Sequence, residues 1–343
     1  MPEPNDCHLS PPLHFQIRAG RDPGRVLSVR EHLASNPTNN PALPLVLITF
    51  HPGYAAGSYE DRDYFERLAP LLRDTCRDCC RLRIYTINHP GYDLPKSFKV
   101  DRFDLREFSI CRQPDAIDQI LRWLLLREFA DEEELYLLTY GHSMGGLALA
   151  RTNFGALQMA VARQGRRAHI IKTLSAPALI LHDRARGNLG QLAALNKIKS
   201  TLGHVPLYET LATSLYKGIS PILYRMVAES YSLNPDCSFF DFPRYNPFIL
   251  LEQGMELLQL NFDQEQLADL LDGSHLILNN RDYMVNSQIL LEAARLANRT
   301  GGQVKVQQID SSHNAEREDP ELIVKATCAI LKPWLQGEVA LTA

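Results

Sequence analysis

The chain alternates between short continuous apolar runs and longer stretches in which apolar residues recur at helical spacing. The runs at 45–50, 82–87, 135–140 and 169–174 read LVLITF, LRIYTI, LYLLTY and HIIKTL. The first is apolar throughout, which is typical of a strand buried on both faces, and the other three are interpreted as further strands. Between and after them, helical spacing predicts helices at 61–72, 116–129 and 145–164. This order predicts an α/β protein with a doubly wound, mostly parallel sheet.

The alternation stops near Ala178 and resumes at His275. The stretch 178–272 lacks a buried strand pattern and has helical segments at 211–230 and 247–260. A strand at 275–278, a helix at 287–298, a strand at 303–309 and a helix at 320–335 follow. We therefore expect residues 13–177 and 273–343 to form the α/β core and residues 178–272 to form a helical cap over the carboxyl edge of the sheet.

The first residues differ from the rest of the chain. Residues 1–12 are polar and hold four prolines, so they are expected to be disordered. Residues 13–18 and 25–30 read as a pair of opening strands, and the turn cluster SNPTNNP at 35–41 follows them.

Residues 141–146 read GHSMGG and match the G-x-S-x-G nucleophile elbow. The serine of this motif, Ser143, must sit on a strained strand-to-helix turn. Gly141 and Gly145 would let the strand and the helix pass close together there. The apolar run at 135–140 precedes the motif and a helix of small residues follows, as the motif requires. The amides at the start of that helix, beginning at Met144, suit a developing oxyanion.

With this elbow, and His142 inside it, the chain resembles the α/β-hydrolase superfamily over residues 40–340. It is similar to the esterases, lipases and thioesterases that carry a helical cap. The loop HPG at 51–53 bears a weak similarity to that of the lipid-droplet-associated hydrolases. The resemblance implies a Ser-His-Asp triad in the chain order Ser, acid, His.

His313 is the expected base of that triad, because it lies in a polar turn after the last strand and before the final helix. His169, His182, His204 and His275 fit less well by position. The loop NNRDYMV after the strand at 275–278 resembles the acidic loop of the family, so Asp282 is the expected acid. Asp183 is the fallback, since some members of the fold place their acid after the earlier strand.

The oxyanion hole requires two backbone donors. Met144 N–H is one. The second would come from the loop His51-Pro52-Gly53-Tyr54, where proline stands in place of the glycine that is common in the family. Because proline has no N–H, the donor must be Gly53 or Tyr54, with a slight preference for Tyr54. A second His-Pro-Gly-Tyr at 89–92 is interpreted as a similar strand exit, although His89 and Asp93 could border the pocket.

Composition places few further limits on the protein. Hydrophobic residues make up 45% and charged residues 22%, as in ordinary soluble globular proteins. A net charge of −4 does not suggest nucleic acid as a partner, because binding it normally requires a basic patch. The first residues lack a basic start followed by an apolar run, so a secretory signal is not expected, and the longest apolar stretch, 43–50, is too short to span a bilayer.

Seven scattered cysteines are typical of reduced thiols, so a cytoplasmic location is expected. Cys76, Cys79 and Cys80 form one tight group that could hold a metal or act in redox chemistry. No second Cys or His pair at zinc-binding spacing stands nearby, which favours ordinary helix cysteines.

Together these observations predict a serine hydrolase that cleaves a carboxylic ester and needs no metal or organic cofactor. The apolar and aromatic residues of the predicted cap favour a hydrophobic acyl substrate. Thioester hydrolysis or acyl transfer in a biosynthetic pathway would use the same triad. A non-catalytic binding protein on a hydrolase fold is a further alternative. Dehalogenase chemistry is disfavoured, since the families in question need aspartate at the elbow. The oligomeric state cannot be derived from these patterns.

Overall fold

The computed structural model describes residues 13–16, 26–32, 42–54, 62–90, 108–183, 185–187, 190 and 247–336. Several predictions fall outside these ranges: the disordered N-terminus at 1–12, the helix at 211–230, Asp93, His204 and most of the cap at 178–272. These stay predictions.

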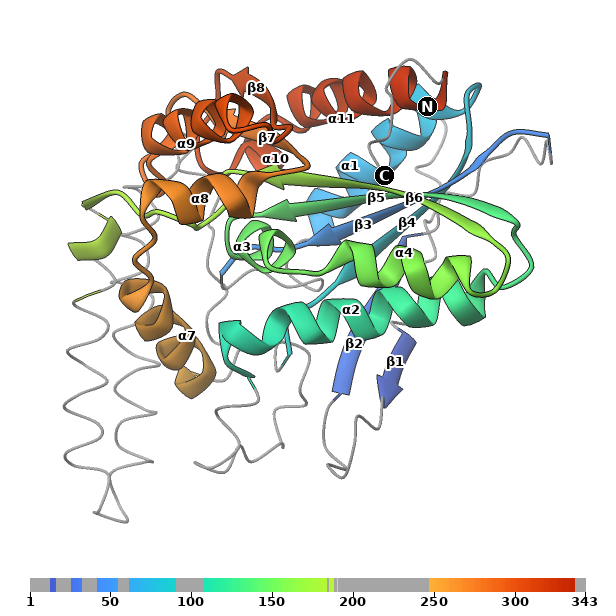
Figure 1. The fold of residues 1–343 in the computed structure, drawn as a ribbon, viewed down its shortest axis with the longest axis horizontal. Coiled ribbons are helices and arrows are strands. Elements are labelled where there is room, and N and C mark those ends of the chain that lie inside the picture. The colour runs from blue at the N-terminus through green and yellow to red at the C-terminus, as the bar shows by residue number, and fades with distance from the viewer. Residues whose placement is uncertain are drawn as a thin grey trace, which may run out of the picture.

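Eight strands form one sheet in the order β1-β2-β4-β3-β5-β6-β7-β8 (Figure 1). β1 and β2 pair antiparallel, as do β2 and β4, whereas all pairs from β4 to β8 are parallel. The mostly parallel sheet predicted from the sequence is thus confirmed. The strands are β1 Leu13–Gln16, β2 Val26–His32, β3 Leu45–His51, β4 Arg81–Ile87, β5 Glu134–His142, β6 Arg167–Ser175, β7 Ser274–Asn279 and β8 Lys305–Ile309.

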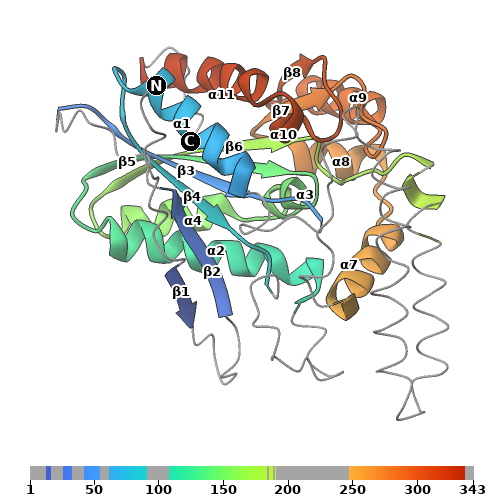
Figure 2. The same cartoon turned by 180° about the vertical axis from the view of Figure 1, so that it is seen from behind.

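Helices cover both faces of this sheet (Figures 1 and 2). α1 and α11 lie side by side on one face, and α2, α3, α4, α8 and α9 pack on the other. The helices are α1 Arg62–Cys76, α2 Gln113–Trp123, α3 Met144–Ala150, α4 Phe154–Ala162, α7 Pro247–Gln259, α8 Gln264–Leu271, α9 Ser287–Arg299, α10 Ala315–Glu318 and α11 Pro320–Leu335, with a 3-10 turn η2 at Ile110–Arg112 and a π turn η3 at Leu124–Glu128.

The continuous apolar runs follow from this layering. Every residue of β3 is buried. Val46 and Ile48 contribute to the core under α1 and α11, while Leu45 and Leu47 contribute to the core on the opposite face. Because side chains alternate along a strand, a sheet covered on both sides needs apolar residues at successive positions. Each such side chain contributes about 1.5–3 kcal/mol on burial.

Two helix predictions were wrong in detail. The helix predicted at 145–164 is interrupted at 151–153, because the Asn153 side chain accepts a hydrogen bond from Ala156 N and starts α4 anew. The helix predicted at 116–129 starts earlier, at Gln113, and passes into the π turn η3, which ends with Phe129 N donating to Leu124 O. The closing helix at 320–335 was predicted correctly.

Register brings the carboxyl ends of the central strands to one edge of the sheet. His51 at the end of β3 pairs with Gly141 of β5, and His142 pairs with Ser175 of β6. On the other side, Asn279 of β7 pairs with Ile309 of β8. The loops that follow these strands therefore leave the sheet next to one another.

The described parts of the predicted cap are mainly helical. α7 is fixed to the core by Glu256, whose carboxylate accepts from Ser109 Oγ at 2.5 Å and from Ile110 N at 2.7 Å. Among the described helices, none combines the length and the apolar character needed to cross a membrane.

Candidate active site

Ser143 occupies a sharp turn between β5 and α3. Its backbone has φ 51° and ψ −114°, a positive φ that side-chain-bearing residues rarely adopt. Hydrogen bonds to the β6 side hold this conformation: Ser143 N donates to Ser175 O at 2.9 Å, and Ala178 N donates to Ser143 O at 2.9 Å. A strained residue kept in place by its surroundings is typical of functional sites.

The two glycines of the elbow stand where backbones nearly touch. A Cβ at Gly145 would lie 2.1 Å from the carbonyl oxygen of His51, and a Cβ at Gly141 would lie 2.6 Å from the carbonyl oxygen of Gly145. No side chain fits at either position without moving main chain. The close approach predicted for Gly141 and Gly145 from the sequence is confirmed.

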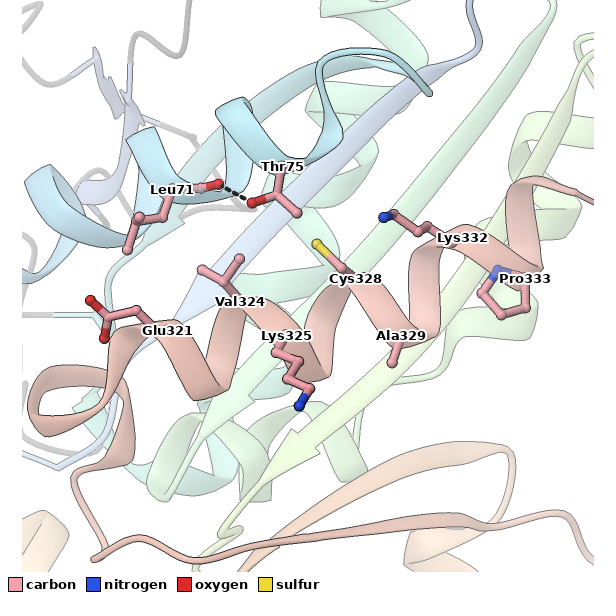
Figure 3. A pocket seen from close by; sticks show the side chains of 9 residues that line it. All are labelled: Leu71, Thr75, Glu321, Val324, Lys325, Cys328, Ala329, Lys332 and Pro333. Carbon is pink, nitrogen blue, oxygen red and sulfur yellow. Dashed lines mark hydrogen bonds between the residues drawn. The ribbon is translucent and has the colours of Figure 1, made fainter.

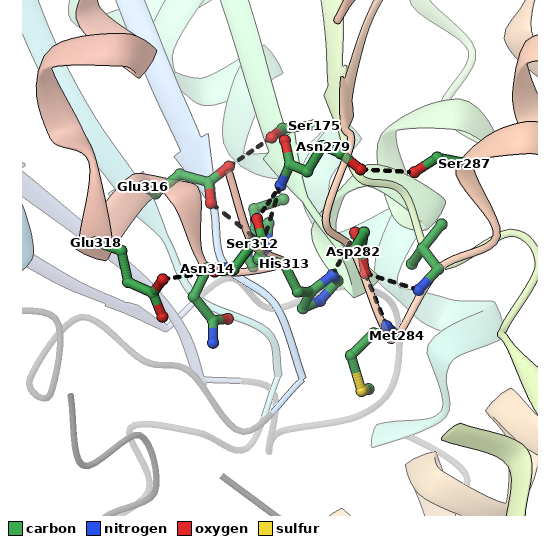
Figure 4. Close-up of polar contacts among 12 residues, drawn as sticks. Ser175, Asn279, Asp282, Met284, Ser287, Ser312, His313, Asn314, Glu316 and Glu318 are labelled. Atoms are coloured by element: carbon green, nitrogen blue, oxygen red, sulfur yellow. Dashed lines mark hydrogen bonds and ion pairs between the residues drawn. The ribbon is translucent and has the colours of Figure 1, made fainter. Parts of the chain in front are cut away.

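His313 and Asp282 form a buried pair at the same edge of the sheet (Figure 4). His313 Nδ1 lies 2.9 Å from Asp282 Oδ2, and the two side chains are 7% and 0% exposed. The other carboxylate oxygen of Asp282 accepts from Met284 N at 2.8 Å and from Val285 N at 2.9 Å. A carboxylate held by two amides has one fixed orientation, so Asp282 in turn fixes the His313 ring.

The charges around His313 favour its protonated form. Burial alone would lower the pKa of this imidazole, but the carboxylate of Asp282, its hydrogen bond and the charge of Glu316 together raise the pKa above the usual 6.5. The Asp282 hydrogen bond also fixes the tautomer of the neutral ring. With the proton on Nδ1, Nε2 is left as an acceptor.

The turn that carries His313 is held from several sides (Figure 4). Asn279 Nδ2, at the end of β7, donates to Ser312 O at 2.6 Å, and Ser312 Oγ donates to Glu318 at 2.8 Å. Ser311 Oγ donates to Asp319, the residue before α11. These contacts tie the turn to both the sheet and the final helices. They were not predicted from the sequence.

Glu316 is a buried carboxylate that sequence reasoning missed. Its Oε1 accepts from Tyr140 Oη at 2.7 Å and from Ser175 Oγ at 2.5 Å, while Oε2 lies 3.5 Å from His142 Nε2. Burial and then the Glu316 charge raise the pKa of Tyr140, so the phenol stays protonated and can donate. The glutamate thus joins the ends of β5 and β6 to the helix directly after His313.

The loop after β3 reaches the elbow through Gly53. A Cβ on Gly53 would lie 3.2 Å from Ser143 Cβ and 3.1 Å from His142 Nδ1. Gly53 is buried, whereas Tyr54 is half-buried and packs against the core on the α2 side. His142 Nε2 in turn contacts His313 O at 2.8 Å, so this loop, the elbow and the pair of His313 and Asp282 are connected by successive contacts.

Comparison with solved structures identifies the fold. A hydrolase from Pseudomonas aeruginosa PA01 superposes with a TM-score of 0.54 at 13% identity, covering 96% of this chain and 100% of its own. The chain has the α/β-hydrolase fold. A bromoperoxidase from Bacillus anthracis gives a TM-score of 0.52 at 13% identity over 94% of this chain and 100% of its own. An acetylester hydrolase from Corynebacterium glutamicum gives 0.51 at 14% identity over 94% of each chain.

At the level of sequence, no protein-family model matches the chain. No curated protein matches it either. Likeness at such low identity concerns the fold, and the chemistry must be argued from the residues themselves.

The other histidines and the fallback acid that the sequence offered have surroundings of their own. His169 stands near the amino end of β6 and its Nε2 contacts Glu134 at 2.7 Å. Burial lowers the pKa of His275, which opens β7, to about 4. His182 and the fallback acid Asp183 are exposed. None of these contacts Ser143 or His313 in the described part of the chain.

The cysteine group lies on the face of the sheet that α1 and α11 cover, opposite the face on which α3 packs. Cys76 Sγ is 3.5 Å from Cys328 Sγ between α1 and α11, and Cys80 is also buried. A surface hollow of about 690 Å³ lies beside this contact and is lined by residues of α1 and α11 (Figure 3). Within the described residues, no group of three or more His, Cys, Asp or Glu side chains is placed to hold a metal ion.

Proposed function

We propose that this protein is a serine hydrolase that cleaves carboxylic esters of hydrophobic substrates, with Ser143 as nucleophile, His313 as base and Asp282 as acid. The observation that carries this proposal is the buried 2.9 Å pair of His313 and Asp282 beside the strained Ser143 turn. A serine hydroxyl alone is a poor nucleophile and needs such an oriented base.

The reaction would proceed through an acyl-enzyme. His313 Nε2 takes the proton of Ser143 Oγ as the hydroxyl attacks the ester carbonyl. The tetrahedral intermediate collapses, and the alcohol leaves with the proton from His313. Water then attacks the acyl carbonyl and gives a proton to the same nitrogen, and the second tetrahedral intermediate collapses to the free acid as His313 returns that proton to Ser143 Oγ. Asp282 holds the ring in one tautomer and stabilises its cation, in keeping with the raised pKa of His313.

Two amides would stabilise the oxyanion. Met144 is the first residue of α3, and the first amides of a helix have no intrahelical acceptor. For the second donor we favour Gly53 over Tyr54, because Gly53 lies directly against Ser143. A side chain at Gly53 would crowd Ser143 and His142, which supports a site where a substrate carbonyl approaches bare backbone.

The substrate class is inferred from apolar residues. Met284, whose N–H donates to Asp282, is half-buried and packs with the apolar core, as does Ile180 after β6. The stretch 178–272, which we propose as a cap over the carboxyl edge, is rich in leucine, phenylalanine and tyrosine. Binding sites for acyl chains are built mainly from such side chains.

The test is labelling with a fluorophosphonate, which reacts with activated serines, in the wild type and in Ser143→Ala. We expect one labelled site, lost in the variant, and hydrolysis of p-nitrophenyl esters that rises with acyl chain length. Thermal unfolding of both proteins controls for folding. Labelling that persists in a folded Ser143→Ala protein would contradict the proposal. If added alcohols capture the acyl group in competition with water, acyl transfer replaces ester hydrolysis as the proposed activity.

A further inference from the structure

The two His-Pro-Gly-Tyr sequences begin next to each other in the fold. His51 ends β3 and His89 comes two residues after β4, and these strands pair in parallel with Phe50 opposite Thr86. His89 of the second segment is buried, and its Nε2 lies 2.5 Å from the carbonyl oxygen of Pro52 in the first. The repeated motif therefore has a physical link between its two copies.

We infer that His89 is a positioning residue for the oxyanion loop: its Nε2–H holds the Pro52 carbonyl and thereby directs the Gly53 N–H toward Ser143. The inference rests on the proposed function, since it concerns the amide that would stabilise the oxyanion.

The geometry of the peptide bond supplies the first reason. In a planar trans peptide, the carbonyl oxygen and the following N–H point in opposite directions. Fixing the Pro52 oxygen on one side therefore fixes the Gly53 N–H on the other. Gly145 lies on the oxygen side, since a Cβ there would be 2.7 Å from Pro52 O. Ser143 lies beside Gly53, since a Cβ on Gly53 would be 3.2 Å from Ser143 Cβ.

The chemistry of Pro52 supplies the second reason. Proline has no N–H, so its carbonyl is the only backbone group through which this residue can be held by hydrogen bonding. The departure from the glycine common at this position thus leaves Pro52 with one backbone group that can form a hydrogen bond, and His89 binds it. A carbonyl only accepts, so the His89 proton must be on Nε2.

The ionisation state of His89 agrees with this role. Burial lowers its pKa to about 4, partly offset by the Pro52 hydrogen bond. The ring is therefore neutral across the physiological range. Its donated proton does not depend on pH there, so the Pro52–Gly53 peptide keeps one orientation wherever His313 is active.

The test compares His89→Ala with His89→Gln, whose side-chain amide can still donate to Pro52 O. In His89→Ala we expect kcat to fall by about 10- to 100-fold. This fall is no larger than that caused by removing an oxyanion donor altogether. KM should change by less than about two-fold. Affinity for a trifluoromethyl ketone, which forms an oxyanion on the serine, should fall in parallel. His89→Gln should recover most of both, and His169→Ala, a histidine remote from Ser143, should match the wild type.

A spectroscopic readout separates position from activity. The chain holds three Pro-Gly pairs, at 23–24, 52–53 and 90–91, so ¹³C-carbonyl proline with ¹⁵N-glycine labelling isolates three amide signals. The Gly53 signal should shift downfield when the ketone binds the wild type. It should move and exchange faster with solvent in His89→Ala and return in His89→Gln.

An unchanged Gly53 signal and kcat in His89→Ala would overturn the inference while leaving the hydrolase intact. A loss of kcat that His89→Gln does not restore would assign His89 a packing role and would also overturn it. If the wild type neither reacts with the fluorophosphonate nor turns over esters, the proposed function itself fails and the catalytic part of the inference with it. The Gly53 signal still reports whether His89 holds the loop.

Discussion

His142 Nε2 donates a hydrogen bond to the main-chain oxygen of His313 at 2.8 Å. The two rings lie with their centroids 4.9 Å apart. Burial, and then the neighbouring His313, lower the pKa of His142, although Glu316 opposes them. A neutral His142 can donate this bond without adding a charge beside His313. The residue before the proposed nucleophile is thereby tied directly to the proposed base.

Replacement of Asp282 by Asn should remove most of the activity. The amide of the new Asn would donate to His313 Nδ1 and so place the ring proton on Nε2. A protonated Nε2 cannot accept the proton of Ser143. We expect kcat to fall by about 10⁴-fold, as tautomer reversal does in serine proteases. The hydrolysis rate of a p-nitrophenyl ester measures it. Asp183→Asn is the control because Asp183 is exposed. Loss of activity in Asp183→Asn, with Asp282→Asn active, would reassign the acid.

Activity should decline in acid with a midpoint above pH 6.5, because His313 must be neutral to accept a proton and its pKa is raised. The Glu316 charge contributes to this rise, so Glu316→Gln should move the midpoint to lower pH. The pH profile of kcat/KM measures this shift. Glu321→Gln, an exposed position on α11, should leave the midpoint in place. A midpoint that stays or rises in Glu316→Gln would show that Glu316 does not act on His313 through its charge.

Gly145→Ala should destabilise the fold by at least about 3 kcal/mol, because overpacking against rigid backbone cannot relax easily. The added carbon would lie 2.1 Å from the carbonyl oxygen of His51. Urea unfolding gives the difference. At Gly155, in α4, the nearest atom to a Cβ would be 3.6 Å away. Gly155→Ala should instead stabilise the helix by up to about 1 kcal/mol. Equal effects at both glycines would contradict the close approach at the elbow.

Thiol reactivity should follow burial. The hydrogen bond to Cys328 alone would lower the pKa of the Cys76 thiol, but contact with Cys80 and burial raise it to about 12. Contact with Cys76 and burial likewise raise the pKa of Cys328. Iodoacetamide should therefore modify exposed Cys111 in the native protein and reach Cys76 and Cys328 only in urea. Peptide mapping by mass spectrometry reads this out, and rapid native labelling of Cys76 would contradict it.

The sheet could be predicted from the sequence because its strands are buried on both faces. Every residue of the run 45–50 is buried, as is every residue of the run 135–140 except the half-buried Tyr136, so the apolar runs located β3 and β5. The elbow could be predicted because its glycines are required by close backbone contact. His313 followed from its place after the last strand, and the structure pairs it with Asp282.

Other parts of the site could not be predicted because their partners are distant in sequence. Glu316 lies in a short helix of charged residues that resembles a surface segment. Only the fold brings it to Ser175 and Tyr140, which are 141 and 176 positions away along the chain. The break before α4 was visible in principle, since Asn153 is a favoured helix-capping residue, but the apolar spacing on both sides concealed it.

The order of strands from β5 outward has a consequence for synthesis on the ribosome. β5, β6, β7 and β8 lie side by side in the sheet in the order in which they are translated. The Ser143 turn can therefore form before Asp282 and His313 have left the ribosome. Under the proposed mechanism, the nascent chain carries a serine without a base and stays inert toward cellular esters. The proposed triad would become complete only when β8 and the turn that carries His313 have folded.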